Sequence, residues 1–102
     1  MIALLSQRRD EIAAVCARRR VKRLEVFGSA AVGAFDPRSS DLDFLVEFLP
    51  LERGERAEAY FGLREDLQEL LGHPVDLVMT RAIRNPYFRQ AVERTREVLY
   101  AA

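Results

Sequence analysis

Apolar residues recur at the spacing of an amphipathic helix in two long segments, residues 2–19 and 55–71. The second helix is expected to end at Gly72, because glycine readily adopts the left-handed conformation that follows many helices, and Pro74 prevents its continuation. The apolar positions that define the two helices are Ile2, Leu5, Ile12, Val15 and Cys16 in the first, and Tyr60, Leu63, Leu67, Leu70 and Leu71 in the second.

Three short segments have the pattern of β-strands: residues 23–28, 41–48 and 75–79. The middle one is the clearest, because its residues alternate between two faces. One face carries Leu42, Phe44, Val46 and Phe48, and the other carries Asp41, Asp43 and Leu45.

The remaining segments complete an alternating order of helices and strands. Residues 28–33 are small and predict a turn that leads into a single helical turn. A last helix is predicted to begin with Asn85 as its cap and Pro86 at its first position, and to run to about Glu97. Residues 98–100 fit either a brief edge strand or a tail. The order α-β-(short α)-β-α-β-α predicts an α/β (α+β) fold with a small mixed sheet packed against helices.

The composition narrows the possible functions. A length of 102 residues predicts a single domain over residues 1–102. Lys+Arg and Asp+Glu both total 16, so we expect no direct binding of nucleic acid, which favours a basic excess. One cysteine and one histidine exclude a disulfide within the chain and a zinc site of the usual type. Without a signal peptide or a long apolar run, the cytoplasm is the expected compartment, with no role in a membrane.

Asp41 and Asp43 are the first candidates for chemistry, because residues two apart on a strand point to the same face. Two adjacent carboxylates repel each other unless a cation lies between them, and hard oxygen ligands suit Mg²⁺. Asp76 lies between apolar residues of the third strand, where an unpaired carboxylate is costly to bury. The structural alternatives are that Asp41 and Asp43 cap a loop through backbone N–H groups and that Asp76 pairs with an arginine.

A glycine and a serine, Gly28 and Ser29, stand at the end of the first strand and can present N–H groups and a hydroxyl to an anion. They meet the strand that carries Asp43 only if those two strands are antiparallel. Asp76 joins them only if its strand is parallel to that of Asp43, and the helix over residues 55–71 supplies the crossover that this requires. One mixed topology therefore brings Ser29, Asp41, Asp43 and Asp76 to the same end of the sheet.

The segments 28–33 (GSAAVG), 40–43 (SDLD) and 75–78 (VDLV) together resemble the nucleotidyltransferase pattern G-S-x-A-x-G, S-D-x-D and V-D-L-V. In size the chain is similar to the minimal nucleotidyltransferases, the MNT domains of the DNA polymerase β-like superfamily. The resemblance implies a two-metal site in which Asp41, Asp43 and Asp76 are catalytic and bind Mg²⁺. It also implies that Gly28 and Ser29 bind the triphosphate of ATP.

The same resemblance implies a partner. Members of the family often act as antitoxins of HEPN toxins, to which they transfer AMP, typically on a tyrosine. We therefore expect an adenylyltransferase in a hetero-oligomer with a HEPN toxin, a homodimer being a further option. Val32 departs from the pattern, because many members have arginine or lysine there. This departure keeps open a second function, a binding module that neutralises its partner by contact alone. The role of that missing basic residue could be taken by another arginine, and the candidates by position are Arg38, Arg81 and Arg84.

Overall fold

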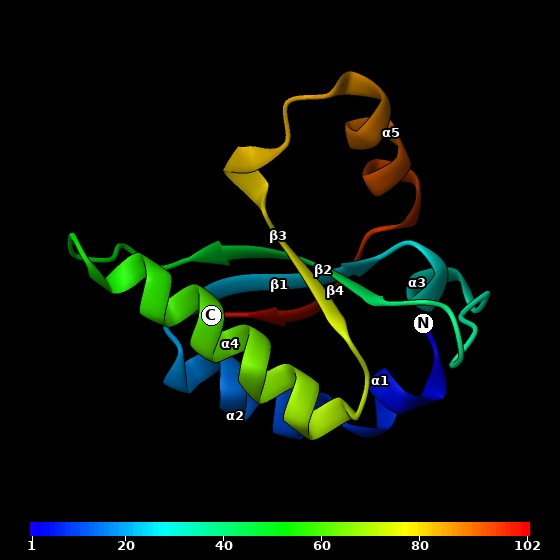
Figure 1. Cartoon of the computed structure of the whole chain (residues 1–102), viewed down its shortest axis with the longest axis horizontal. Coiled ribbons are helices and arrows are strands. Elements are labelled where there is room, and N and C mark those ends of the chain that lie inside the picture. The colour runs from blue at the N-terminus through cyan, green and yellow to red at the C-terminus, as the bar shows by residue number, and fades with distance from the viewer.

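The computed structural model describes residues 1–102 and contains a four-stranded sheet with helices on both faces (Figure 1). No helix in it is both long enough and apolar enough to cross a membrane. The elements, in chain order, are α1 (Ala3–Gln7), α2 (Arg9–Arg18), β1 (Val21–Phe27), α3 (Ser29–Val32), β2 (Leu42–Phe48), α4 (Glu55–Leu71), β3 (Val75–Met79), the 3-10 turn η1 (Thr80–Ala82), α5 (Pro86–Thr95) and β4 (Glu97–Ala101).

The sheet has the mixed topology that the sequence predicts. Its strand order is β3-β2-β1-β4. β1 is antiparallel to both β2 and β4, whereas β2 and β3 are parallel and joined by α4. The C-terminal end of β1 and the N-terminal ends of β2 and β3 therefore lie at the same end of the sheet.

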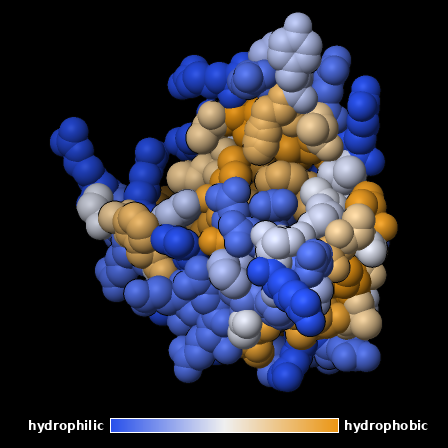
Figure 2. All heavy atoms as spheres, turned by 45° about the vertical axis from the view of Figure 1, so that its right-hand side comes forward, coloured by the Kyte–Doolittle hydropathy of each residue, from blue (hydrophilic) through white to orange (hydrophobic).

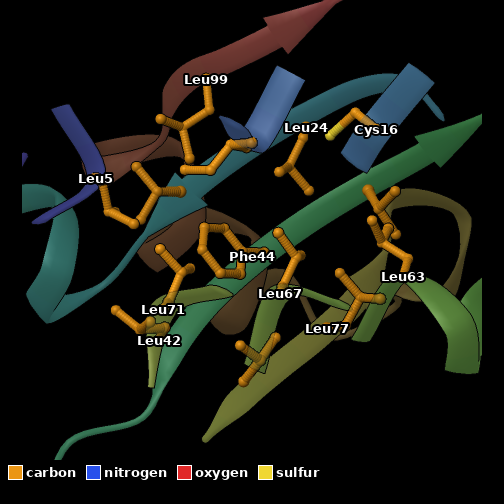
Figure 3. Close-up of a cluster of buried hydrophobic side chains, with 14 of the residues drawn as sticks. Leu5, Cys16, Leu24, Leu42, Phe44, Leu63, Leu67, Leu71, Leu77 and Leu99 are labelled. Atoms are coloured by element: carbon orange, nitrogen blue, oxygen red, sulfur yellow. The ribbon is translucent and has the colours of Figure 1, made fainter. Parts of the chain in front are cut away.

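The main core lies between the sheet and the layer formed by α1, α2 and α4 (Figure 1). Phe44 stands near its centre, surrounded by Leu5 of α1, Leu24 of β1, and Leu67 and Leu71 of α4 (Figure 3). The alternation predicted for β2 is confirmed, because Leu42, Phe44 and Val46 all belong to this core. Burial of such side chains contributes about 1.5–3 kcal/mol each and holds the three strand ends in register.

The opposite face of the sheet is covered only in part, by α5. A small apolar cluster joins Val92 of α5 to Phe27 of β1 and Leu45 of β2. The rings of Phe27 and Phe88 add to this contact, with centroids 5.8 Å apart. Most of α5 is exposed, and Val92 is its one buried residue. The face that carries Asp43 and Leu45 is therefore open beside this helix.

Two predicted helix boundaries are wrong. The helix predicted over residues 2–19 is interrupted at Arg8, whose φ of −103° and ψ of 14° separate α1 from α2. The bend brings the N-terminus onto α3, where the Ile2 N–H donates to the Ala30 carbonyl at 2.9 Å. The helix predicted to run to about Glu97 ends at Thr95, because the next residues pair with β1 as strand β4. Residues 98–100 are thus part of an edge strand.

Candidate active site

Three strand ends bring two of the predicted carboxylates directly together. In the register of the sheet Asp43 lies opposite Phe27 of β1 on one side and opposite Asp76 of β3 on the other. Asp41 comes one residue before β2 and is exposed, whereas Asp43 is half-buried. The expectation that these acids share one end of the sheet agrees with this placement.

Gly28 packs directly against the Asp43 carboxylate. Its backbone has φ 72° and ψ −149°, a conformation that is essentially restricted to glycine. A Cβ atom at this position would lie 2.6 Å from Asp43 Oδ2, closer than any real contact of that kind. Glycine is therefore required here for two separate reasons, the backbone angle and the space. Ser29 follows at once as the first residue of α3.

None of the three carboxylates is neutralised by a basic side chain. The ion pairs of the chain do not involve Asp41, Asp43 or Asp76. Burial, followed by the negative charges of Asp76 and Asp41, raises the pKa of Asp43 to about 6. A cation placed here would relieve both effects.

The structural alternative of a loop-capping aspartate is realised by a different residue, Asp36. Its carboxylate accepts from the Arg38 N–H at 2.9 Å and from the Ser39 hydroxyl at 3.0 Å. These hydrogen bonds lower the pKa of Asp36, the opposite of the shift at Asp43. The loop before β2 thus has its own capping acid, and Asp41 and Asp43 remain available for another role.

Thr95, at the end of α5, is a residue of this region that sequence reasoning missed. Its hydroxyl accepts a hydrogen bond of 2.9 Å from the Gly28 N–H and donates one of 3.1 Å to the Ala91 carbonyl. Gly28 and Thr95 are 67 residues apart, and a threonine near a helix end carries no signal of such a contact. The Gly28 N–H is accordingly occupied within the protein.

Beside the carboxylates, α5 and the end of β3 form an apolar wall. Val78, Ile83 and Phe88 pack there against the cluster around Leu45. The space-filling view shows apolar side chains gathered in the upper part of this face, framed by hydrophilic ones (Figure 2). Tyr87, in the first turn of α5, is 82% exposed and stands clear of this wall.

The arginines that could take the place of a basic residue at position 32 lie in different parts of the structure. Val32 is 61% exposed at the end of α3. Arg81 lies at the opposite end of the sheet, because the neighbouring Thr80 hydroxyl donates to the carbonyl of Val46, late in β2. Arg38 lies in the loop that precedes Asp41. By position, Arg38 is therefore a better candidate than Arg81 for a contact with phosphate.

Five basic residues cluster between the end of α2 and the start of β1, and all of them are paired within the chain. Their side chains form ion pairs with acidic residues of β1, β2 and α4, which explains the cluster without a ligand. The pairs are Arg18 and Arg19 with Asp66, Arg20 with Glu55, Lys22 with Glu47, and Arg23 with Glu25.

The donor set suits a divalent cation that is completed by a ligand. No three Asp, Glu, His or Cys side chains are grouped so as to hold a metal ion among them. Mg²⁺ in phosphate-binding sites commonly takes only one or two carboxylates, with water and phosphate oxygens as the other ligands. Two register-paired aspartates without a cation partner, one of them with a raised pKa, fit that requirement. The ligand role of each aspartate stays a prediction.

Comparison with known proteins gives a consistent result. The nucleotidyltransferase domain family matches residues 9–99. Two proposed protein adenylyltransferases of Methanocaldococcus jannaschii are 40% and 38% identical over 74 residues. Each match covers 72% of this chain, and 71% and 72% of the two relatives.

Solved structures agree with the sequence relatives. A proposed minimal nucleotidyltransferase is 38% identical with a TM-score of 0.72, covering 91% of this chain and 90% of that one. A toxin–antitoxin crystal structure with AMP-PNP matches with a TM-score of 0.69 and 23% identity, over 92% and 73% of the two chains. A complex of tri-AMPylated Shewanella oneidensis HEPN toxin with MNT antitoxin matches with 0.64 and 19%, over 96% and 73%. The last two likenesses concern the fold.

Proposed function

The chain belongs to the nucleotidyltransferase domain family, and from this premise we propose that it is a Mg²⁺-dependent protein adenylyltransferase. Its substrate is ATP, and the acceptor of AMP is a tyrosine hydroxyl of a partner HEPN toxin, which the modification silences. The chain is then the antitoxin of the pair. The names of its relatives support the transfer of AMP to protein, and the complexes that share its fold support the partner.

One observation carries the proposal: Asp43 and Asp76 lie opposite each other on β2 and β3 without a basic side chain between them, and Asp43 lies against the backbone of Gly28. A structural pair of acids would be expected to recruit one of the chain's many arginines. Instead the protein keeps repelling charges together at a half-buried position, which raises the pKa of Asp43. Such perturbed groups are typical of functional sites.

In the proposed reaction Asp41, Asp43 and Asp76 would hold the metal. The turn from Gly28 to Ser29 would receive the triphosphate, with Gly28 shaping the turn while its N–H stays bonded to Thr95. When bound, Mg²⁺ supplies positive charge that offsets the charge on the phosphate oxygens. The acceptor hydroxyl oxygen bonds to the α-phosphorus as the bond to pyrophosphate breaks. Asp76, the exposed acid on β3, takes the hydroxyl proton, and pyrophosphate leaves with the electron pair of the broken bond.

The direct test uses the product of the neighbouring gene as the acceptor. The chain is incubated with Mg²⁺, ATP labelled at the α-phosphate and that protein, and the label on the acceptor is measured. Transfer by the wild type and its loss in Asp41→Asn, Asp43→Asn and Asp76→Asn are expected. Asp36→Asn is the matched control, because Asp36 caps its own loop and is expected to leave transfer intact.

The exposed Val32 favours a second function, inhibition of the partner by contact alone. A basic residue at this position would be able to reach phosphate from the end of α3, and valine cannot. Inhibition of the toxin that survives Asp43→Asn, with no label transferred by the wild type, would establish this alternative and refute the transferase.

A further inference from the structure

We infer that Thr95 is a positioning residue of the nucleotide site, which acts by holding the Gly28 peptide in place. The inference rests on the proposed function, since it assigns a role at the same site. It starts from one contact: the Thr95 hydroxyl accepts the Gly28 N–H at 2.9 Å, across 67 residues of sequence.

The direction of this hydrogen bond is fixed by its surroundings. The Gly28 N–H can only donate, and the one proton of the Thr95 hydroxyl is directed to helix carbonyls, that of Ala91 at 3.1 Å or that of Val92 at 3.5 Å. The lone pairs of the hydroxyl are then left to accept the Gly28 N–H. The amide of Gly28 is therefore saturated by protein, and a phosphate must find its donors from Ser29 onward.

This contact matters because Gly28 fixes the position of Asp43. Gly28 has φ 72° and ψ −149°, a conformation that glycine adopts without strain, and without a side chain its peptide depends on hydrogen bonds and neighbouring groups for its orientation. Its Cα lies against the Asp43 carboxylate, where even a methyl group would be 2.6 Å from Oδ2. Release of the Gly28 N–H allows the peptide to rotate. The distance between the phosphate-binding turn and the Asp43 carboxylate is then no longer fixed.

The role also links the site to α5. Val92 is the only buried residue of this helix, so the helix is held mainly by the small cluster beneath it and by its junction with β4. Thr95 is the last residue of α5, immediately before that junction. A displacement of α5 is thus transmitted to Gly28 through a single hydroxyl.

The test compares Thr95→Val, which has the same shape without the hydroxyl, with Thr95→Ser, which keeps it. The matched control is Thr80→Val, because Thr80 also bonds a backbone carbonyl, that of Val46 at 3.3 Å, at the other end of the sheet. The dissociation constant of a non-hydrolysable ATP analogue with Mg²⁺ is measured by calorimetry, and the melting temperature of each variant is measured alongside.

We expect Thr95→Val to weaken analogue binding about 3- to 10-fold, the size expected for one neutral hydrogen bond. Thr95→Ser restores the wild-type affinity. Thr80→Val binds as the wild type does, even where its melting temperature falls by as much as that of Thr95→Val. In turnover assays Thr95→Val raises KM for ATP more than it lowers kcat.

Each of the following results would overturn the inference. Unchanged affinity in Thr95→Val does so, and tighter binding would mean that phosphate uses the Gly28 N–H itself. Equal weakening in Thr80→Val would mean a general loss of stability. If Thr95→Val does not fold, hydrogen exchange of the Gly28 amide in the wild type decides, because rapid exchange would show that the bond is absent. A wild type that binds no analogue removes the proposed function as well.

Discussion

At the scale of single residues, Gly28 makes the sharpest prediction. Gly28→Ala adds a methyl group 2.6 Å from Asp43 Oδ2 and requires a backbone conformation that costs about 1–3 kcal/mol without glycine. We expect a loss of at least about 2 kcal/mol in the free energy of unfolding, because both penalties apply. The affinity for ATP, measured by calorimetry, should fall more than about tenfold, since a loss of about 1.4 kcal/mol in binding free energy corresponds to a factor of ten.

Gly33 provides the control for that substitution. It also has a positive φ, 81°, but a Cβ there would meet nothing within 4 Å. Gly33→Ala should therefore cost only the left-handed backbone penalty of about 1–2 kcal/mol and leave nucleotide affinity unchanged. Equal losses of affinity in the two variants would contradict the close approach of Gly28 to Asp43.

The second residue-scale prediction concerns the stability of the metal-free protein as a function of pH. The pKa of Asp43 is raised to about 6, so its ionised form is less favourable in the folded than in the unfolded chain. The resulting destabilisation is absent below the unfolded pKa, near 4, and complete above about 6. Asp43→Asn should thus melt at a higher temperature than the wild type at pH 7–8 in EDTA, and the difference should vanish toward pH 4.

Asp36 should behave in the opposite way. Hydrogen bonds from the Arg38 N–H and the Ser39 hydroxyl lower its pKa, so its ionised form stabilises the fold above the unfolded pKa and that contribution is lost as the pH falls. Asp36→Asn should therefore lower the melting temperature at neutral pH. A melting temperature of Asp43→Asn that equals the wild type at pH 8 would refute the electrostatic account of the site.

The residues of the site were predictable to different degrees. The positions of Asp43 and Asp76 follow from the alternation of side chains on strands and from the need for a helical crossover between parallel strands. The room that Gly28 leaves for Asp43 depends on the exact register of β1 and β2, and the bond to Thr95 depends on how α5 packs on the sheet. Contacts of that kind have no periodicity in the sequence, and they emerge only from the folded chain.

At the scale of elements, the start of α5 gives the next prediction. The Asn85 side chain accepts from the N–H groups of Tyr87 and Phe88 at 2.9 and 3.3 Å. Asn85→Ala should cost about 1 kcal/mol in the free energy of unfolding measured with urea, the usual value of an N-cap. Asn85→Asp keeps the acceptor oxygen and should retain the stability. An Asp variant as unstable as the Ala variant would exclude the capping interaction as the cause.

Element boundaries were less predictable than the elements themselves. The bounds of α4 and β3 agree with the prediction, because Gly72 and Pro74 leave the chain little choice between them. The break at Arg8 has no such marker, since apolar spacing continues across it and only contact with α3 requires a bend. The end of α5 is likewise decided by pairing of β4 with β1, a tertiary effect that overrides local helix propensity.

At the scale of the whole molecule, charge is distributed so that the site remains electronegative. The basic residues between the end of α2 and the start of β1 form ion pairs within the chain. The buried Glu25 on β1 pairs with Arg23 at 2.6 Å and with Arg96 at 2.8 Å. The carboxylates at the edge of β2 and β3 receive none of these cations. Although the net charge is zero, the carboxylates of Asp41, Asp43 and Asp76 form an acidic site without basic partners. A divalent cation bound together with ATP would neutralise it.

This arrangement predicts a large effect of ligand on stability. A ligand that binds only the folded state at 100 times its dissociation constant adds about 2.7 kcal/mol, and 1 kcal/mol raises the melting temperature of a domain this small by about 4–8 °C. Mg²⁺ with a non-hydrolysable ATP analogue should therefore raise the melting temperature of the wild type by roughly 10–20 °C under those conditions. The analogue with EDTA should have little effect, because nothing would then offset the repulsion between phosphate and carboxylates. Asp43→Asn should abolish the shift and Asp36→Asn should preserve it. An equal shift in the wild type and both variants would mean that the nucleotide binds away from this acidic site.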